Sequence, residues 1–308
     1  MKLSLVIPCY NEEETINLMY NELTKIFNDN QEFEMLFIND GSKDGTLLKV
    51  SDLTQTDERV KFISFSRNFG KEAAMYAGMK YASGDYIAIL DADLQHPPSM
   101  LPEMIKALDE GYDVAAARRT DRGGEAALKS FFSHKFYSVI NKLADVKIEE
   151  GAQDFRVMKR KVVDSILNMP EYFRFSKGIF SWVGFNTKWF AHENVDRPAG
   201  KSKFSSYKLF KYAVDGIISF SVVPLRMSLV FGILISLFGY IYGTSIIIST
   251  LITKSAGTGT GYASLMSGLL IIGGTILICL GILGEYISRI YIESKNRPIF
   301  IIEKTNID

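Results

Sequence analysis

Short apolar runs alternate with segments of helical spacing over the first 120 residues of the chain. The runs typical of strands buried on both faces cover residues 3–8, 33–38, 60–65, 86–90 and 113–117. The segments that predict helices cover residues 12–27, 46–54, 71–82 and 98–110. Regular alternation of strand and helix indicates an α/β fold with a mostly parallel sheet covered on both faces.

The pattern becomes less regular after residue 118. It predicts a long helix over 125–143, strands over 153–158 and 186–191, and helices over 161–167 and 177–183. Residues 203–221 then show an amphipathic helix with lysines near the edge of its apolar face. Because a long apolar segment follows directly, we expect this helix to lie on the membrane surface. The alternative is an ordinary helix docked on the sheet.

Two long stretches, 227–253 and 255–284, contain no charged residue, and Lys254 lies between them. Each exceeds the roughly 20 residues that a helix needs to cross a bilayer, so they predict a membrane hairpin rather than buried helices of a soluble protein. The expected organisation is a catalytic domain over 1–200, a juxtamembrane amphipathic helix over 201–226, transmembrane helices over 227–252 and 264–287, an extracytoplasmic loop over 253–263 and a cytosolic tail over 288–308.

Basic residues flank the predicted hairpin on the outside, whereas the connecting loop contains only Lys254. This bias predicts a two-span membrane protein with both termini in the cytoplasm. Residues 1–8 are too short for a signal peptide, so the catalytic part is expected to be cytosolic. The spans lack the ionisable residues that usually line a transport pathway, which disfavours a flippase or channel.

Composition excludes some classes of function. Lys plus Arg and Asp plus Glu each number 35, so charge gives no reason to expect a nucleic-acid partner. The two cysteines, Cys9 and Cys279, form neither a disulfide framework nor a metal-binding spacing. Packing is the role we expect for both.

Two carboxylates, Asp91 and Asp93, follow the apolar run 86–90 directly, and Gln95 lies two residues further on. They therefore sit at the carboxyl end of a strand, where open α/β sheets bind their ligands. Hard oxygen ligands of this kind suit Mg²⁺ or Mn²⁺ carrying a substrate diphosphate. The alternative is an Asx-rich turn that caps the next helix.

Other polar side chains follow the first three strands at the same edge. These candidates for a nucleotide-binding site are Pro8, Tyr10, Asn11, Glu12, Asp40, Ser42 and Asn68, together with Asp91 and Asp93. Asp40 can accept hydrogen bonds from a base or ribose, and Tyr10 can stack on a base. Each residue alone fits a turn or a helix cap, but their order and spacing together indicate a nucleotide ligand.

Three strings carry a family resemblance: Val-Ile-Pro-Cys-Tyr-Asn-Glu-Glu from Val6, Asn-Asp-Gly-Ser from Asn39, and Asp-Ala-Asp-Leu-Gln-His-Pro-Pro from Asp91. They resemble family 2 glycosyltransferases of the GT-A fold. The similarity is greater to polyprenyl-phosphate glycosyltransferases, which include bactoprenol glucosyltransferase and dolichol-phosphate mannose synthase. It covers almost the whole chain, because the two C-terminal spans also match the membrane-bound bacterial branch.

The resemblance implies an inverting, metal-dependent transfer of one sugar from a nucleotide sugar to undecaprenyl phosphate for cell-envelope glycosylation. UDP-glucose is the favoured donor, with UDP-N-acetylglucosamine and GDP-mannose as alternatives. It implies that Asp40 holds the base, and that Asp91, Asp93 and Gln95 bind Mg²⁺ or Mn²⁺ and the diphosphate.

By the same resemblance, Asp154 in the string 151–156 corresponds to an acceptor-side acid, and the catalytic set becomes Asp91, Asp93 and Asp154. A phosphate acceptor is largely ionised near pH 7, since its second pKa is about 6. Asp154 is therefore expected to orient the acceptor or balance charge rather than to remove a proton. The alternative is a helix or turn cap.

A phosphate acceptor also requires cations. The candidates are Arg118, Arg119, Lys129, Arg197, Lys201 and Lys203. Arg118 is the first choice because it directly follows a predicted strand and because guanidinium groups bind phosphate in a bidentate manner. For any one of these residues the alternative is a solvated surface charge.

Other functions fit the sequence less well. A processive polysaccharide synthase normally carries a Gln-x-x-Arg-Trp motif, which is absent here, and a P-loop would need glycine where Val195 stands. A membrane-tethered scaffold without activity would be expected to have lost some of the acidic residues.

Residues 297–303 predict an edge strand that pairs with a neighbouring subunit, and hence a homo-oligomer.

Overall fold

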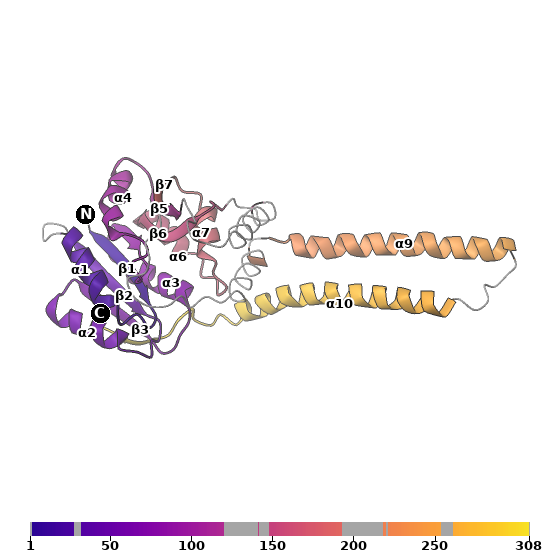
Figure 1. Cartoon of the computed structure of the whole chain (residues 1–308), viewed down its shortest axis with the longest axis horizontal. Coiled ribbons are helices and arrows are strands. Elements are labelled where there is room, and N and C mark those ends of the chain that lie inside the picture. The colour runs from indigo at the N-terminus through magenta and orange to yellow at the C-terminus, as the bar shows by residue number, and fades with distance from the viewer. Residues whose placement is uncertain are drawn as a thin grey trace. The chain divides into compact units, whose positions relative to one another are not determined.

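The computed structural model describes residues 2–27, 32–119, 141, 148–192, 218–219, 221–253 and 261–307. The chain divides into two compact units (Figure 1). The first contains Met1–Ser219 and Arg297–Asp308, and the second contains Phe220–Asn296. The chain therefore leaves the first unit, forms the second, and returns to the first at its C-terminal end.

An eight-stranded sheet forms the centre of the described part of the first unit, in the order β7-β5-β6-β4-β1-β2-β3-β8. Its strands are β1 (Leu3–Cys9), β2 (Phe33–Asn39), β3 (Val60–Phe65), β4 (Tyr86–Ile89), β5 (Val114–Arg119), β6 (Ala152–Lys159), β7 (Thr187–His192) and β8 (Ile302–Thr305). Neighbours among β1 to β4 pair in parallel, as do β5 and β7. Strand β6 runs antiparallel to β4 and β5, and β8 runs antiparallel to β3. The expected mostly parallel α/β sheet is confirmed.

Helices cover both faces of this sheet. They are α1 (Ile16–Ile26), α2 (Thr46–Thr56), α3 (Lys71–Tyr81), the 3-10 turn η1 (Pro98–Met100), α4 (Leu101–Asp109), α6 (Arg160–Leu167) and α7 (Ser176–Trp182). Successive strand residues point to opposite faces. In β1, Leu5 belongs to the core cluster that also contains Met19 of α1, whereas Val6 meets Gly78 of α3. Helices α1 and α3 therefore lie on opposite faces.

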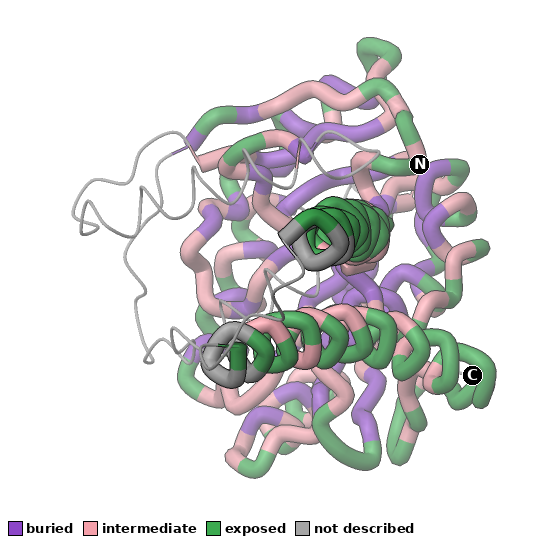
Figure 2. The backbone as a smooth tube through the Cα atoms, turned by 90° about the vertical axis from the view of Figure 1, so that its right-hand side faces the viewer, coloured by how far each residue is buried: buried purple, intermediate pink, exposed green. Residues whose placement is uncertain are grey.

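The buried strands account for the near-continuous apolar runs of the sequence. Every residue of β2 is buried, and β1 is buried except at Pro8. Buried backbone runs through the interior of the first unit (Figure 2). The observed bounds agree with the predicted ones to within a few residues, and β3 spans 60–65 as expected. The predicted helix over 125–143 and the amphipathic helix over 203–221 lie almost wholly outside the described residues.

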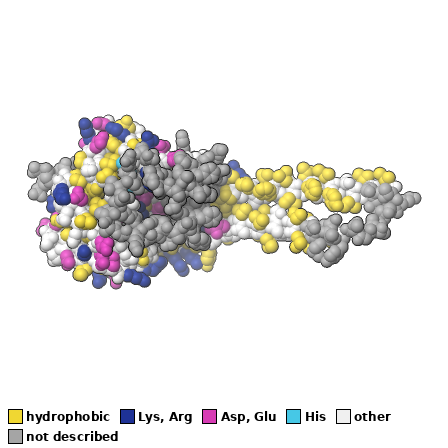
Figure 3. Space-filling model, in the orientation of Figure 1, with side chains coloured by type: hydrophobic (Ala, Val, Ile, Leu, Met, Phe, Trp, Pro, Cys, Tyr) yellow, Lys and Arg dark blue, Asp and Glu magenta, His cyan; other side chains and the backbone are white. Residues whose placement is uncertain are grey.

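The second unit is a pair of long helices, α9 (Val223–Thr253) and α10 (Gly261–Ser294). Both contain segments that are long and apolar enough to cross a membrane, at Val223–Ile246 and Gly268–Ser294. Hydrophobic side chains are spread along both helices (Figure 3). Within the unit, the Tyr286 hydroxyl donates a hydrogen bond to the carbonyl of Ser221 at 2.6 Å. Helix α10 extends seven residues beyond the predicted end at 287.

The C-terminal tail returns to the sheet of the first unit. Strand β8 pairs with β3 of the same chain, which replaces our expectation that this segment would pair with a neighbouring subunit. The Asn306 side chain accepts a hydrogen bond from the Phe62 N–H at 2.7 Å and donates one to the Val60 carbonyl at 3.2 Å. Phe300 stacks on Phe65 with ring centroids 5.0 Å apart. The open edge of β3 explains the choice of partner, because it offers unpaired backbone groups.

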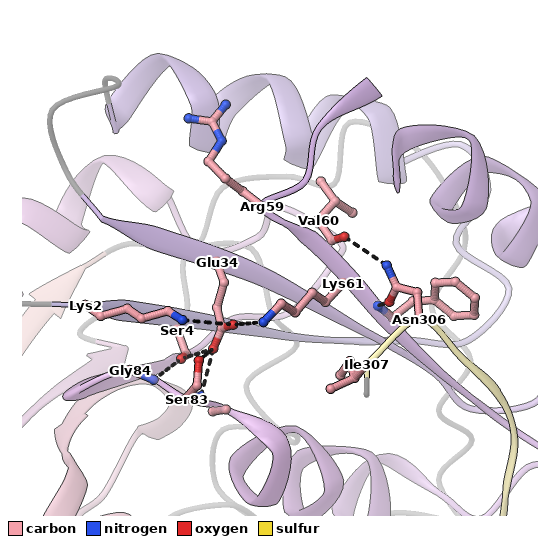
Figure 4. Close-up of polar contacts among 12 residues, drawn as sticks. Lys2, Ser4, Glu34, Arg59, Val60, Lys61, Ser83, Gly84, Asn306 and Ile307 are labelled. Atoms are coloured by element: carbon pink, nitrogen blue, oxygen red, sulfur yellow. Dashed lines mark hydrogen bonds and ion pairs between the residues drawn. The ribbon is translucent and has the colours of Figure 1, made fainter. Parts of the chain in front are cut away.

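A buried carboxylate holds the amino-terminal edge of the sheet together (Figure 4). Glu34 of β2 is 2% exposed. It accepts hydrogen bonds from Ser4 at 2.5 Å, from the backbone and hydroxyl of Ser83 at 2.8 Å each, and from Lys61 at 2.7 Å. Burial alone would raise the pKa of Glu34, but these bonds outweigh it and lower the pKa to about 2. The cluster thus ties β1, β2 and β3 to the turn before β4.

Candidate active site

The loops after β1 and β2 are joined to each other at the carboxyl edge of the sheet. The Asn11 N–H donates to the Ser42 hydroxyl at 2.9 Å, and the Asn11 side-chain carbonyl accepts from the Lys43 N–H at 2.8 Å. The Glu12 N–H donates to the Thr46 hydroxyl at 2.8 Å. Three residues predicted to bind the nucleotide sugar, Asn11, Glu12 and Ser42, therefore lie side by side at one edge.

Asp40 organises the next loop. Its carboxylate is buried, and its two oxygens accept the N–H groups of Phe69 at 2.6 Å and Gly70 at 2.9 Å. The Asn68 side chain donates to the Asp40 carbonyl at 3.3 Å. Burial raises the pKa of Asp40 to about 6, against the effect of these hydrogen bonds. Asp40 thus fixes the segment that leads into α3, while its predicted contact with a base stays a prediction.

A glycine is required where the β2 loop approaches this segment. Gly41 has φ +64°, and a Cβ there would lie 2.4 Å from the backbone carbonyl carbon of Arg67. Both the left-handed backbone and the close approach exclude larger residues. The Asn-Asp-Gly-Ser string therefore reflects local geometry as well as candidate chemistry.

The carboxylates of Asp91 and Asp93 follow β4, as expected. Asp93 Oδ1 accepts the Gln95 N–H at 3.2 Å, and Leu94 adopts φ +55°. The Asx turn that we considered as an alternative is therefore present. It does not exclude a role in binding, because both aspartates remain at the carboxyl edge of the sheet and both are partly exposed.

One ammonium group joins the two parts of the predicted catalytic set. Lys71 Nζ, at the first residue of α3, lies 2.5 Å from Asp91 Oδ1 and 2.6 Å from Asp154 Oδ2. Burial would lower the pKa of Lys71, but the charges of Asp154 and Asp91 outweigh it and raise the pKa. Burial would raise the pKa of Asp154, but Lys71 and Lys177 hold it below its usual range. Asp154 is therefore ionised at neutral pH, and it lies on β6 rather than at a cap.

Two histidines lie behind Asp91. His96 Nε2 is 3.7 Å from Asp91 Oδ2, and His96 Nδ1 is 2.9 Å from His192 Nε2. His96 also stacks on Phe155 with ring centroids 5.8 Å apart. Burial lowers the pKa of both histidines, which favours neutral rings at pH 7. The two rings are thus hydrogen-bonded to each other beside Asp91, and they add no positive charge there.

The donor atoms fit a divalent cation that also binds substrate. Among the described residues no group of three His, Cys, Asp or Glu side chains forms a metal cage. Mg²⁺ commonly uses one or two carboxylates, several waters and substrate phosphates, so Asp91 and Asp93 suffice as protein ligands. The ammonium of Lys71 against Asp91 shows that this position favours a cation. Gln95 lies beside the pair and remains a predicted third ligand.

The predicted phosphate-binding cations are only partly described. Arg118, at the end of β5, forms an ion pair with Glu149 at 3.1 Å, and Arg119 is in register with His192 of β7. The other four candidates lie outside the described residues: Lys129, Arg197, Lys201 and Lys203. The structure therefore brings Arg118 and Arg119 to the carboxyl end of β5 and leaves the rest as predictions.

Sequence reasoning missed Lys71, His96, His192 and Glu72. The signal for Lys71 was its position directly after the Asn-Phe-Gly loop at the start of a helix. His96 lies within the Asp91–Pro98 string itself. Glu72 is held by the N–H and hydroxyl of Ser176, a contact between segments 104 residues apart, which no local pattern reveals.

Comparison with known proteins now decides the family. Residues 4–167 match Glycosyl transferase family 2, and residues 223–290 match the GtrB C-terminal hairpin. The chain belongs to glycosyltransferase family 2. The family match confirms the resemblance that the Asn39 and Asp91 strings indicated. It identifies the protein as a glycosyltransferase with a GT-A type sheet.

Curated relatives of this family 2 chain match it along its whole length. It is 44% identical to a bactoprenol glucosyl transferase of Shigella phage SfII, over 99% of both chains. It is 45% identical to the putative glycosyltransferase CsbB of Bacillus subtilis, over 99% of this chain and 92% of that one. Among solved structures it resembles glucosyl-3-phosphoglycerate synthase from Mycobacterium tuberculosis, with TM-score 0.48, 16% identity, and coverage of 71% and 79%.

Proposed function

We propose that this glycosyltransferase moves one glucose from UDP-glucose to undecaprenyl phosphate, with inversion at the anomeric carbon. The observation that carries the proposal is the Lys71 bridge, because Lys71 Nζ contacts both Asp91, which we assign to the donor, and Asp154, which we assign to the acceptor. The names of the relatives, bactoprenol glucosyl transferases at about 44% identity, support the acceptor class and the sugar.

In this proposal Asp91, Asp93 and Gln95 hold Mg²⁺ or Mn²⁺, which would offset charge on the departing nucleoside diphosphate. The loops after β1 and β2 bind the nucleotide. Asp154 stays ionised beside Lys71 and orients the acceptor phosphate, whose oxygen needs little deprotonation near pH 7. Arg118 and Arg119 contribute positive charge at the end of β5.

We further propose that the hairpin spans the membrane and that both of its ends are cytosolic. The support comes from the tail: the chain before α9 and the chain after α10 belong to the same unit, since β8 pairs with β3. On this proposal, both ends of the hairpin lie on the side of the membrane that holds the catalytic sheet. Cysteine labelling from outside intact cells should reach a cysteine introduced at a position between 254 and 260. It should not reach a cysteine introduced at Ser51 or Thr305.

A panel of radiolabelled sugar nucleotides tests the reaction. Purified protein is incubated with undecaprenyl phosphate, Mg²⁺ or Mn²⁺, and UDP-glucose, UDP-N-acetylglucosamine or GDP-mannose, and the lipid is then extracted. Label in the lipid phase only with UDP-glucose is the expected result. Transfer from another nucleotide sugar would change the donor assignment, and no transfer from any donor would contradict the proposal.

The variant Asp93→Ala tests the metal site, with Asp52→Ala on the exposed face of α2 as the matched control. We expect Asp93→Ala to abolish metal-dependent transfer while Asp52→Ala retains it. Full transfer by Asp93→Ala would rule out the proposed metal role.

A further inference from the structure

A cavity of about 180 Å³ lies between β6, β7 and α7, outside the carboxylate site. Its charged lining residues are Arg156, Lys177 and Glu149, and its aromatic lining residues include Phe180 and Trp189. All of these belong to the first unit. None was among the residues that the sequence suggested for the site.

The cavity carries excess positive charge. Arg156 is 3% exposed, and its hydrogen bonds among the described residues go to backbone carbonyls, those of Asp154 at 3.2 Å and Gln153 at 2.6 Å. Lys177 is partly exposed and forms no ion pair within 4.0 Å among the described residues, although its charge helps to lower the pKa of the nearby Asp154. Glu149 is paired with Arg118 at 3.1 Å. Asp154 acts on both cations but is already paired with Lys71, so the buried Arg156 and the partly exposed Lys177 still favour an anionic occupant.

The aromatic walls restrict the kind of anion. The Arg156 guanidinium lies 3.5 Å from the ring centre of Phe180, and Trp189 forms part of the same lining. A phosphate monoester carries about −1.5 to −2 charge at pH 7, which matches two cations. Apolar surface beside that charge suits a phosphate with a hydrocarbon chain rather than a free ion.

The cavity is also close to the reacting groups. Residues 154 and 156 alternate with 155 along β6, so Asp154 and Arg156 point to the same face, roughly 7 Å apart along the strand. Asp154 in turn contacts Lys71, which contacts Asp91. An anion held by Arg156 and Lys177 would therefore lie next to the acceptor-side carboxylate.

We propose that this cavity binds the phosphate head of the polyprenyl phosphate, with Arg156 and Lys177 on the phosphate oxygens and Trp189 against the first isoprene unit. The assignment rests on the proposed function for its choice of lipid. It adds two cations to the acceptor side that come from β6 and α7.

The two tryptophans of the chain provide a direct readout. Trp189 lines the cavity, whereas Trp182 is 60% exposed. In the full-length Trp182→Phe protein, farnesyl phosphate should change the Trp189 emission in a saturable manner without any donor present. In Trp189→Phe the remaining Trp182 should report no such change. Equal signals from the two variants would indicate partition into detergent and would overturn the proposal.

The variant Lys177→Ala, made in the Trp182→Phe background, tests the charge. We expect its Kd for farnesyl phosphate to rise at least about tenfold, since one of two phosphate contacts is lost. Lys188→Ala is the matched control, because Lys188 lies on β7 but pairs with Glu110 at 3.0 Å, and its Kd should not change. An unchanged Kd for Lys177→Ala would overturn the assignment.

Two further titrants separate the sources of the signal. Inorganic phosphate binding as tightly as farnesyl phosphate would overturn the lipid part of the proposal, and farnesol binding as tightly would overturn the phosphate part. Weak binding of both supports it. Because the assay contains no nucleotide sugar, saturable binding combined with no transfer from any donor would contradict the proposed reaction and leave this site standing.

Discussion

Lys71 Nζ lies 2.6 Å from Asp154 Oδ2, although the two residues are 83 positions apart in the sequence. The same ammonium contacts Asp91 at 2.5 Å. Lys71 is placed by the Phe69–Gly70 turn, whose N–H groups are held by the buried carboxylate of Asp40. Asp40, which is predicted to bind the nucleotide, is thus connected through Lys71 to Asp154, the predicted acceptor-side acid.

The first prediction concerns Lys71 as a positioning residue. Lys71→Met removes the cation between Asp91 and Asp154, so the two carboxylates should repel each other and move. We expect kcat for sugar transfer to fall about 100-fold, the scale of a small misplacement of reacting groups. Steady-state kinetics on purified protein, with a thermal melt to confirm folding, measures the effect.

Lys80→Met is the control for Lys71→Met, because Lys80 is exposed near the end of the same helix. It should leave both kcat and the melting temperature unchanged. Lys71→Arg keeps the charge and should recover part of the rate. Wild-type kcat in Lys71→Met would show that the bridge has no part in the reaction.

The second prediction is a loss of stability at acid pH that depends on Glu34. Its pKa is about 2 in the folded protein, below the value of about 4.3 in an unfolded chain. The resulting stability is fully present above pH 4.3 and is lost as the pH falls from there through about 2. A shift of this size corresponds to roughly 3 kcal/mol at most.

Thermal melts between pH 2.5 and 7 test the role of Glu34. Glu34→Gln should melt at a lower temperature than wild type at pH 7, and the difference should shrink as the pH falls. Glu22→Gln is the control, because the Glu22 side chain is 46% exposed on α1 and pairs with Lys25 of the same helix. A constant difference across this pH range would contradict the assignment of the acid transition to Glu34.

Local patterns predicted the strands, helices and acidic clusters, because each depends on residues close together in the chain. The apolar runs of β1 and β2 and the Asp-x-Asp string after β4 are of this kind. The antiparallel direction of β6 could not be predicted, since a strand pattern is the same in either direction. The His96–His192 contact spans 96 residues and depends on β7 lying beside β5.

The partner of the C-terminal strand shows the same limit. The sequence of 297–303 predicts an edge strand but contains no information about which edge it will meet. The observed strand is shifted to Ile302–Thr305, and Asn306, just beyond the predicted segment, is hydrogen-bonded to Phe62 of β3. The choice between a neighbouring subunit and the same chain is thus decided by tertiary structure.

The third prediction tests this tail. Asn306→Ala removes two hydrogen bonds to the backbone of β3, at Phe62 and Val60. We expect a loss of about 1–2 kcal/mol in the local stability of the tail, at about 1 kcal/mol for each bond. Hydrogen exchange of the β8 amides, followed by mass spectrometry, should show faster exchange there than in β1.

Glu303→Ala provides the matched control for the tail, because Glu303 is an exposed residue of the same strand. Its β8 amides should exchange at the wild-type rate. If Asn306→Ala also exchanged at that rate, the side-chain bonds to β3 would not secure the strand.

The last prediction concerns the close contact between α3 and β1, on which the position of Lys71 depends. A Cβ at Gly78 would lie 2.1 Å from Val6 Cγ1, so Gly78→Ala must push the helix away from the strand or force Val6 out of its rotamer. Overpacking of this kind costs roughly 1–3 kcal/mol. We expect a lower melting temperature and, since α3 carries Lys71, reduced transfer.

Val6→Ala supplies the compensating change, because it removes the methyl groups that the new Cβ would meet. Alone it should cost roughly 2 kcal/mol through the cavity it leaves. In the double variant the two effects should cost less than their sum by at least about 1 kcal/mol, since contacting residues couple in a mutant cycle. Strict additivity in the melting free energies would mean that Gly78 matters for backbone freedom and not for its contact with Val6.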